Sequence, residues 1–324
     1  MGTGIFYFQT NQIFYLMKKL FFLAIAATVM LFSCSKNTSD PNDPVEVRFS
    51  GNIAQLQTRV GETTWDATDK VGIFMTSSHD PYGYTVWTDL EEYYANKAYT
   101  ATSGTTANFT PVDGKPMYYP QDGSEVDVYA YYPYNTTTGN SGFPPYGPEI
   151  FVDATDQSDL SAIDILWARE LGVDKTSGPI SLKFFHMMTK LVFNISYGDE
   201  LVAPAPEETR YDFVVFDVRT KGQLTIFGGN VAASPDLATV VADGEDKVEI
   251  ILPPQTHANI AVAIEDGWGE KYNLVIPNGT WAMCNIYTYN VTLKKAGVAA
   301  LISGTISPWG IGTPIDIDGF LKEE

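Results

Sequence analysis

The chain has 324 residues and a formal net charge of −19, so it repels the phosphate backbone of nucleic acids, which are excluded as partners. Its length is typical of two domains. Two cysteines are too few for a disulfide framework, so apolar cores have to stabilise the fold. Abundant Tyr, Phe, Thr and Val, together with 27 Gly and 19 Pro, predict strands separated by turns, and hence an all-β protein.

The first segment is typical of a secretory signal peptide. Lys18 and Lys19 precede an apolar run of about a dozen residues, which is too short to span a bilayer. The run ends in Leu31-Phe32-Ser33-Cys34, which resembles the lipobox of bacterial lipoproteins. We expect cleavage after residue 33 and attachment of lipid to Cys34, which would anchor the mature chain in the outer membrane. Residues 1–16 precede Met17, the more natural start, and are interpreted as the product of a misplaced start codon.

A polar tether and a series of strands follow. Residues 34–44 are predicted to be a lipidated, flexible tether, because NTSDPNDP at 37–44 is polar and broken by proline. If Cys34 carries lipid, Cys284 has no partner for an intrachain disulfide. From Val45 onward, alternation of apolar and polar residues predicts strands at 45–49, 71–75, 126–132, 191–197, 213–218, 248–252, 260–265, 272–276 and 286–293.

The spacing of these strands predicts the architecture. Tight hairpin turns are expected at Asp113-Gly114, Asp122-Gly123, Asp243-Gly244 and Asn278-Gly279. Only residues 159–170 favour a helix, and strands without intervening helices indicate antiparallel sandwiches rather than α/β units. The sequence DKTSGP at 174–179 interrupts the apolar pattern. We therefore predict an N-terminal β-sandwich at 45–178 and a C-terminal β-sandwich at 179–324.

The sequence offers little that is typical of catalysis or metal binding. It has no nucleophile elbow, no P-loop and no dinucleotide-binding glycine motif after a strand. His79, His186 and His257 are far apart and lack metal-ligand spacing. His186 lies in an apolar run and is predicted to be a hydrogen-bonded core histidine, and the tyrosines of 129–134 are predicted to be core and turn residues. We expect no enzyme activity, no cofactor and no metal.

Several short motifs follow one another along nearly the whole mature chain. They are Val47-Arg48-Phe49 with Thr58-Arg59, WDATDKVGIF at 65–74, YYPQDG at 118–123, VDVYAYYPY at 126–134, FFHMMTKL at 184–191, YNVTL at 289–293 and ISPW at 306–309. Their order resembles the fimbrillin family, the subunits of type V pili of Gram-negative bacteria. Thr68 stands where the family usually has glycine, so that turn is expected to differ.

This resemblance implies a fold, a function and a maturation step. The fold would be two transthyretin-like antiparallel β-sandwich domains in tandem, and the protein would be a structural or adhesive subunit of a cell-surface fimbria. In the family an arginine-specific protease cuts at a position such as Arg59, and the strand before it leaves with the lipid. Other fimbrial subunits would be the partners of the matured chain.

The two ends of the mature chain carry similar apolar patterns. Val45, Val47, Phe49 and Ile53 fall on one face of an extended N-terminal strand, and Trp309, Ile311, Ile315 and Ile317 fall on one face of an extended C-terminal segment. We hypothesise that cleavage after Arg59 opens a groove, which a neighbour's segment within 306–324 fills by strand addition. Alternatively, this segment pairs within its own chain as an edge strand.

Two other functions stay open at this stage. A surface glycan-binding lipoprotein would present exposed Trp and Tyr together on one face of a sandwich. A lipid-anchored hydrolase would hold two carboxylates in a pocket at catalytic separation. The sequence does not distinguish stalk, anchor and tip subunits, of which a tip subunit would bind a host or glycan ligand and needs no donated strand.

Overall fold

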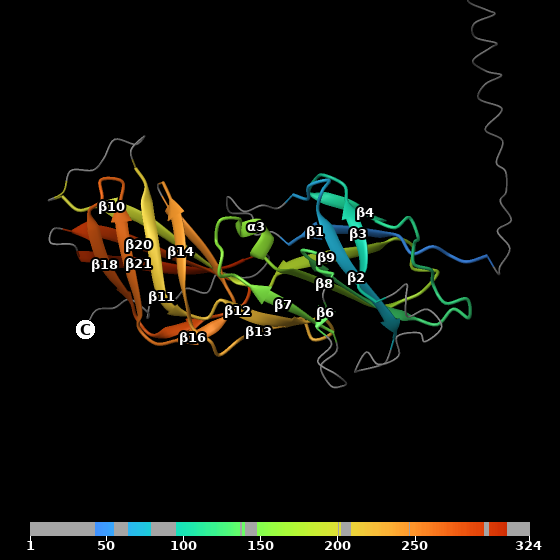
Figure 1. Ribbon diagram of the computed structural model, residues 1–324. Helices are drawn as coiled ribbons and strands as arrows, with labels where there is room; N and C mark the ends of the chain where they lie inside the picture. The colour runs from blue at the N-terminus through green and yellow to red at the C-terminus, as the bar shows by residue number, and fades with distance from the viewer. Residues whose placement is uncertain are drawn as a thin grey trace, which may run out of the picture. The chain divides into compact units, whose positions relative to one another are not determined.

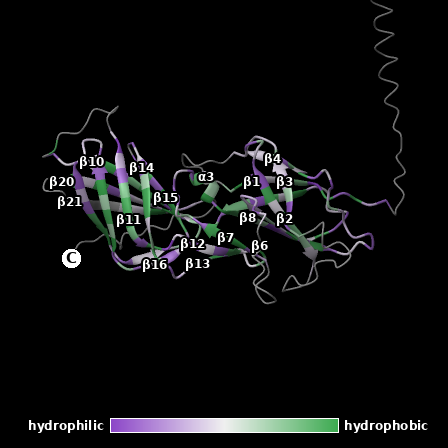
Figure 2. Ribbon diagram, in the orientation of Figure 1, coloured by the Kyte–Doolittle hydropathy of each residue, from purple (hydrophilic) through white to green (hydrophobic). Residues whose placement is uncertain are grey.

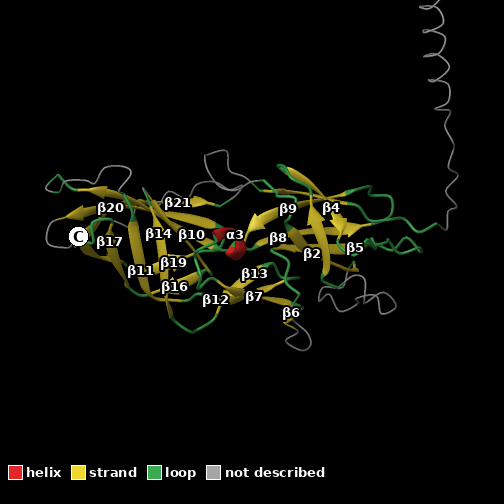
Figure 3. Cartoon of the chain, turned by 45° about the horizontal axis from the view of Figure 1, so that its top comes forward, coloured by secondary structure: helices red, strands yellow, loops and turns green. Residues whose placement is uncertain are grey.

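The fold is built almost entirely of β-strands. The computed structural model describes residues 43–54, 64–78, 95–136, 138–139, 148–199, 201, 209–245, 247–294 and 298–309. Within these ranges the strands are accompanied by one short helix, α3 (Leu160–Ile163), shown in red in Figure 3. No helix of these ranges has the length and apolar character needed to cross a bilayer. The predicted all-β class is confirmed.

Seven strands of the N-terminal half close into a barrel (Figure 1). In spatial order they are β1 (Phe49–Ile53), β4 (Thr106–Pro111), β3 (Lys97–Ala101), β2 (Lys70–Ser77), β5 (Val126–Tyr132), β8 (Leu166–Val173) and β9 (Ile180–His186). β1 closes the barrel, because it pairs antiparallel with β4 and parallel with β9. The barrel therefore departs from the predicted purely antiparallel arrangement at one pairing.

Alternating side chains fill the barrel. Val47, Phe49 and Ile53 at its N-terminal end are buried together with Phe109 and Phe184. Figure 2 shows the same interleaving of hydrophobic and hydrophilic residues along the strands. Because successive side chains of a strand point to opposite faces, this pattern gives each strand a core face.

A second sheet carries most of the C-terminal half. Its eight strands are, in spatial order, β14 (Ala238–Gly244), β11 (Tyr211–Val218), β17 (Ile260–Asp266), β18 (Lys271–Ile276), β21 (Val298–Pro308), β20 (Asn285–Lys294), β10 (Thr189–Tyr197) and β15 (Lys247–Leu252). β10 has the same pairing pattern as β1, since it pairs antiparallel with β15 and parallel with β20. Its core is a separate cluster around Phe193, Phe213 and Trp281.

Two small sheets complete the fold. The first has the order β13 (Asn230–Ala233), β12 (Lys221–Thr225), β7 (Glu149–Asp153) and β6 (Thr138–Gly139), and the second pairs β16 (Gln255–His257) with β19 (Gly279–Trp281). β7 and β12 come from different halves of the chain and pair from Glu149 with Thr225 to Asp153 with Lys221. A third apolar core likewise draws residues from both halves. The described residues from 44 onward belong to one compact unit.

Three details differ from the sequence predictions. The predicted helix at 159–170 is limited to α3, which Asp159 caps by accepting a hydrogen bond from the Ser161 amide, and β8 follows directly. The predicted strand at 45–49 joins the barrel ladder only from Phe49. The chain passes from the barrel into the second sheet between His186 and Thr189, later than the boundary predicted after residue 178, because β9 belongs to the barrel. Apolar periodicity identifies a strand, but not the sheet to which it belongs.

Candidate assembly site

The N-terminal strand is held on both of its edges. On one side Val47 N–H donates to the Met117 carbonyl and Tyr119 N–H donates to the Val45 carbonyl, both at 2.9 Å. On the other side Ile180 N–H donates to the Arg48 carbonyl at 2.8 Å. Residues 45–54 are therefore an integral part of the barrel wall rather than a loose extension.

Three of the four predicted apolar residues of this strand are buried. Val47, Phe49 and Ile53 are exposed by only 2%, 3% and 7%. Val45, by contrast, is 41% exposed, so its assignment to the buried face is corrected. Val45 precedes β1, and its side chain is not covered by the barrel core although its carbonyl is hydrogen-bonded to Tyr119. The core therefore takes up the side chains at 47, 49 and 53.

Gly51 completes this face and is not among the residues predicted from the sequence. A Cβ atom at Gly51 would lie 2.6 Å from Cε2 of Phe109 and 2.9 Å from Cε2 of Phe184, which is closer than real Cβ atoms approach their neighbours. The two phenyl rings thus cover the backbone of β1 at this point. A glycine within an alternating apolar strand was the available signal, because it often marks such a close approach.

The C-terminal candidate residues divide into two groups. Ile311, Ile315 and Ile317 lie outside the described residues. Trp309 is 7% exposed, and its backbone N–H donates to the Cys284 carbonyl at 2.6 Å. Its indole stacks on the imidazole of His186 with ring centroids 4.3 Å apart.

These contacts correct the extent of the candidate donor segment. Residues 306–308 belong to β21, where Ile306 pairs with Tyr287 and Pro308 with Asn285. β21 lies between β20 and β18 within its own sheet. Trp309 and β21 are thus part of the subunit's own fold, and the predicted donor segment is reduced to residues 310–324.

The two residues predicted to be lipidated or cleaved lie outside the described ranges. Cys34 lies before the first described residue, and Arg59 lies in the undescribed stretch 55–63. The described residues on either side of that stretch are anchored, because Ala54 N–H donates to the Phe184 carbonyl at 2.7 Å and Trp65 N–H donates to the Gly104 carbonyl at 2.9 Å. Arg59 therefore separates β1 from the rest of the barrel in the sequence.

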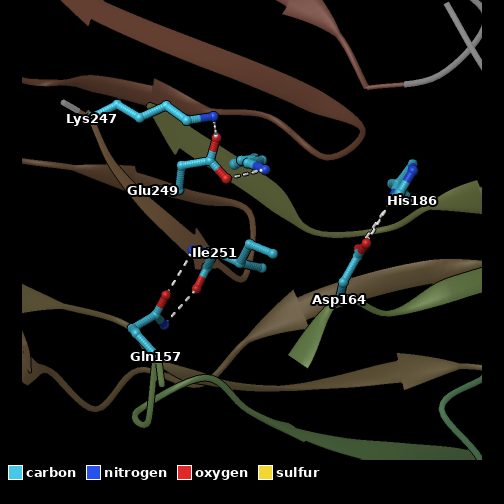
Figure 4. Close-up of polar contacts among 7 residues, drawn as sticks. Gln157, Asp164, His186, Lys247, Glu249 and Ile251 are labelled. Carbon is cyan, nitrogen blue, oxygen red and sulfur yellow. Dashed lines mark hydrogen bonds and ion pairs between the residues drawn. The ribbon is translucent and has the colours of Figure 1, made fainter. Parts of the chain in front are cut away.

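Polar contacts join segments from the two halves of the chain (Figure 4). The side-chain amide of Gln157 donates to the Ile251 carbonyl at 2.9 Å and accepts from the Ile251 N–H at 2.9 Å. His186 Nδ1 lies 2.8 Å from a carboxylate oxygen of Asp164, which confirms the predicted hydrogen-bonded core histidine. The segment from Gln157 to Asp164, which contains α3, is thereby bound to both β9 and β15.

Glu249 is an enclosed carboxylate in this region. Its oxygens accept hydrogen bonds at 2.6 Å from both Lys190 and Lys247 (Figure 4). Burial raises the pKa of the Glu249 carboxyl, but the two ammonium groups outweigh burial, and the pKa lies below its ordinary value. Glu249 is therefore charged at neutral pH and pairs β15 with β10.

One pocket contains several carboxylates, as a hydrolase would require, but their contacts serve the fold. The pocket has a volume of about 190 Å³ and is lined in part by Asp66, Asp69 and Asp164. Asp69 accepts a hydrogen bond from the Tyr132 hydroxyl at 3.1 Å, and Asp164 binds His186. Two of the three carboxylates thus hold neighbouring elements together. Among the described residues, no group of three or more His, Cys, Asp or Glu is placed to hold a metal ion.

Aromatic residues mainly serve the cores. Tyr129 and Tyr131 are 7% and 0% exposed, as predicted for the tyrosine-rich strand. A second pocket, of about 220 Å³, is lined by Trp281, itself 1% exposed, and by His257. The exposed Trp268 and Tyr118 belong to different parts of the described fold: Trp268 lies between β17 and β18, and Tyr118 pairs with Glu46 ahead of β1. The described residues therefore show no shared aromatic face of the kind expected for glycan stacking.

Comparisons with known proteins agree with the motifs. Residues 58–309 match the family model described as fimbrillin-like. A protein of Bacteroides uniformis that bears the name fimbrium subunit Fim1C is 27% identical over 316 residues, covering 91% of this chain and 96% of the relative.

Two solved structures share the fold. A protein of Bacteroides uniformis, named as a cell adhesion protein, superimposes with a TM-score of 0.65 at 22% identity, covering 82% of this chain and 98% of that one. A second, from Bacteroides ovatus and with the same kind of name, gives a TM-score of 0.65 at 19% identity, covering 83% and 99%. Because the family model spans most of the sequence, the chain belongs to the fimbrillin-like family.

Proposed function

We propose that this chain is a structural or adhesive subunit of a cell-surface fimbria that is exported as an outer-membrane lipoprotein and assembled by strand replacement. Family membership supports the fimbrial role. The observation that carries the assembly route is the position of β1, which is inserted between β4 and β9 and precedes Arg59. A single cut after Arg59 would detach from the chain the strand that closes the barrel.

The first step is lipid attachment at Cys34. The lipid holds the chain at the outer membrane while β1 completes the barrel, so the subunit is folded before it assembles. Because Cys34 and β1 lie on the same side of Arg59 in the sequence, one cut separates both from the remaining chain. Membrane release and opening of the barrel are therefore coupled.

The second step exposes two strand edges and an apolar groove. Without β1, the edges of β4 and β9 lose their partner, and Phe109 and Phe184 lose the backbone that they cover. Unpaired strand edges readily add another strand. The opened barrel is thus prepared to accept an extended segment from another subunit.

The third step is insertion of a neighbour's C-terminal segment. Burial of three large apolar side chains of residues 310–324 at roughly 1.5 to 3 kcal/mol each would give a gross driving force of about 5 to 9 kcal/mol per joint, before ordering costs. A joint between one subunit's C-terminal segment and the next subunit's barrel is head to tail. Because such joints do not close into a ring, repeated joining generates filaments.

Limited digestion with an arginine-specific protease, followed by negative-stain electron microscopy, tests this proposal. The wild-type protein should be trimmed to begin at Val60 and form filaments, and Arg59→Ala should remain monomeric. Arg48→Ala is the matched control and should be trimmed and form filaments like wild type. The backbone of Arg48 is paired with Ile180, so the protease should not cut at this position. Filaments of equal length from Arg59→Ala would contradict the proposal.

A further inference from the structure

The register of the inserted strand follows from Gly51, and this inference rests on the proposed function. The phenyl rings of Phe109 and Phe184 approach the backbone at this position within 2.6 and 2.9 Å of where a Cβ atom would be. Both rings belong to the barrel and stay behind when β1 leaves. A strand that takes the place of β1 while both rings keep these positions therefore carries a residue without a side chain here.

The positions around Gly51 impose further requirements. Val47, Phe49, Gly51 and Ile53 occupy alternate positions of the strand, so they lie on the same face, and the three side chains are buried. A replacement strand must therefore present apolar, apolar, glycine and apolar residues at alternate positions. The outward positions between them tolerate polar residues, because Arg48 is exposed and Ser50 and Asn52 are half-buried.

The C-terminal segment contains this pattern once. Residues 315–321 read IDIDGFL. We propose that, in a second copy of the chain, these residues replace residues 47–53 in the same direction, with Gly319 at the position of Gly51. Ile315, Ile317 and Leu321 then take the places of Val47, Phe49 and Ile53.

Other alignments fail on the same criteria. Placing Gly312 at position 51 puts Gly310 at the place of Phe49 and uses Pro308, which belongs to β21. Placing Gly310 there uses still more of β21. With Gly319 at position 51 but the strand reversed, Glu323 falls at the buried place of Val47. Burying an unpaired carboxylate is costly, so the direction of β1 is retained.

The outward residues fit the neighbouring strand as well. Asp318 takes the place of Ser50, which pairs with Ser181 of β9. Lys183 lies two residues further along the same exposed side of β9. Diagonal neighbours on a sheet are within reach of long side chains, so Lys183 and Asp318 have complementary charges in this register. Residues 310–314 contain two glycines and form the link to Trp309.

Two glycine variants test the register. In Gly319→Val the added side chain meets Phe109 and Phe184, so filament formation by the trimmed protein should fall at least 10-fold. Gly312→Val is the matched control and should assemble like wild type. If both variants assemble equally well, the register is wrong but strand replacement still stands. If trimmed wild-type protein forms no filaments, both the proposed function and the register are overturned.

Disulfide trapping reads the register and direction independently of any loss of assembly. Ser50 pairs directly with Asn108 of β4, so Asp318→Cys and Asn108→Cys, combined in a Cys284→Ser background, should cross-link successive subunits of the filament. Phe320→Cys with Asn108→Cys should not, because residue 320 falls at the position of Asn52. Efficient cross-linking through residue 320 in place of 318 would show the reversed strand and overturn the inference.

Discussion

The imidazole of His186 stacks on the indole of Trp309, with an angle of 11° between the ring planes and 4.3 Å between the ring centroids. His186 ends the last strand of the barrel, and Trp309 directly follows the last strand of the second sheet. Lys190 adds a cation 5.8 Å from the centre of the indole ring. The end of the described C-terminal region is therefore fixed to the junction between the barrel and the second sheet.

Replacement of Trp309 should destabilise the subunit itself. Trp309→Ala removes a buried indole from the third core, and we expect a loss of about 3 to 5 kcal/mol in the free energy of unfolding, measured by urea denaturation. Trp268→Ala, which removes an indole that is 51% exposed, should cost much less. If Trp309→Ala abolished filament formation without changing monomer stability, Trp309 would belong to the donated segment after all.

Acid should weaken the pairing of β15 with β10 through Glu249. The pKa of this carboxyl is lowered in the folded state, so its contribution to stability is fully present above the unfolded pKa and is lost as pH falls through the folded pKa. We expect Glu249→Gln to lower the urea midpoint at pH 7 and to reduce the decline in stability below about pH 4.5. Glu170→Gln, at an exposed position, is the control. An unchanged pH dependence in Glu249→Gln would contradict the assigned role of the two lysines.

Charge placed on the donated face should block assembly without unfolding the subunit. Ile315→Lys puts an ammonium group among apolar side chains of the neighbour's groove, so trimmed protein should form few filaments while its melting temperature stays near that of wild type. Asp316→Lys changes the opposite face of the same strand and should assemble normally. A large drop in the melting temperature of Ile315→Lys would instead place this segment in its own subunit.

Lipid attachment is predicted at a single thiol. Cys34→Ala should leave the precursor uncleaved by the lipoprotein signal peptidase and abolish incorporation of a labelled fatty acid. Cys284→Ser should be labelled like wild type, because Cys284 is half-buried within the fold. Equal labelling of Cys34→Ala and wild type would remove the basis for a lipoprotein.

Local sequence patterns predict much of the fold. The expected strands at 126–132 and 248–252 agree closely with β5 and β15, because alternation reports directly which residues face a core. The start of β8 instead falls within the segment predicted as helix, since exposed residues at 169–172 hide the alternation of this strand.

Non-local relationships could not be predicted in this way. The parallel pairing of β1 with β9 joins segments far apart in the sequence, Phe49 with Ile180 for example, and no local pattern specifies such a partner. The stacking of His186 on Trp309 is of the same kind. Gly51 could be predicted only in part. Its position within a strand follows from the local sequence, but its contacts with the rings of Phe109 and Phe184 do not.

The composition of subunits within assembled fimbriae tests the central claim most directly. Intact-mass measurement of subunits released from purified fimbriae should give a chain that begins at Val60 and retains its C-terminal end, with residues 34–59 and the lipid removed. A subunit that still carries residues 34–59, covalently or as a bound fragment, would show that β1 keeps its place between β4 and β9 and that assembly does not proceed by strand replacement.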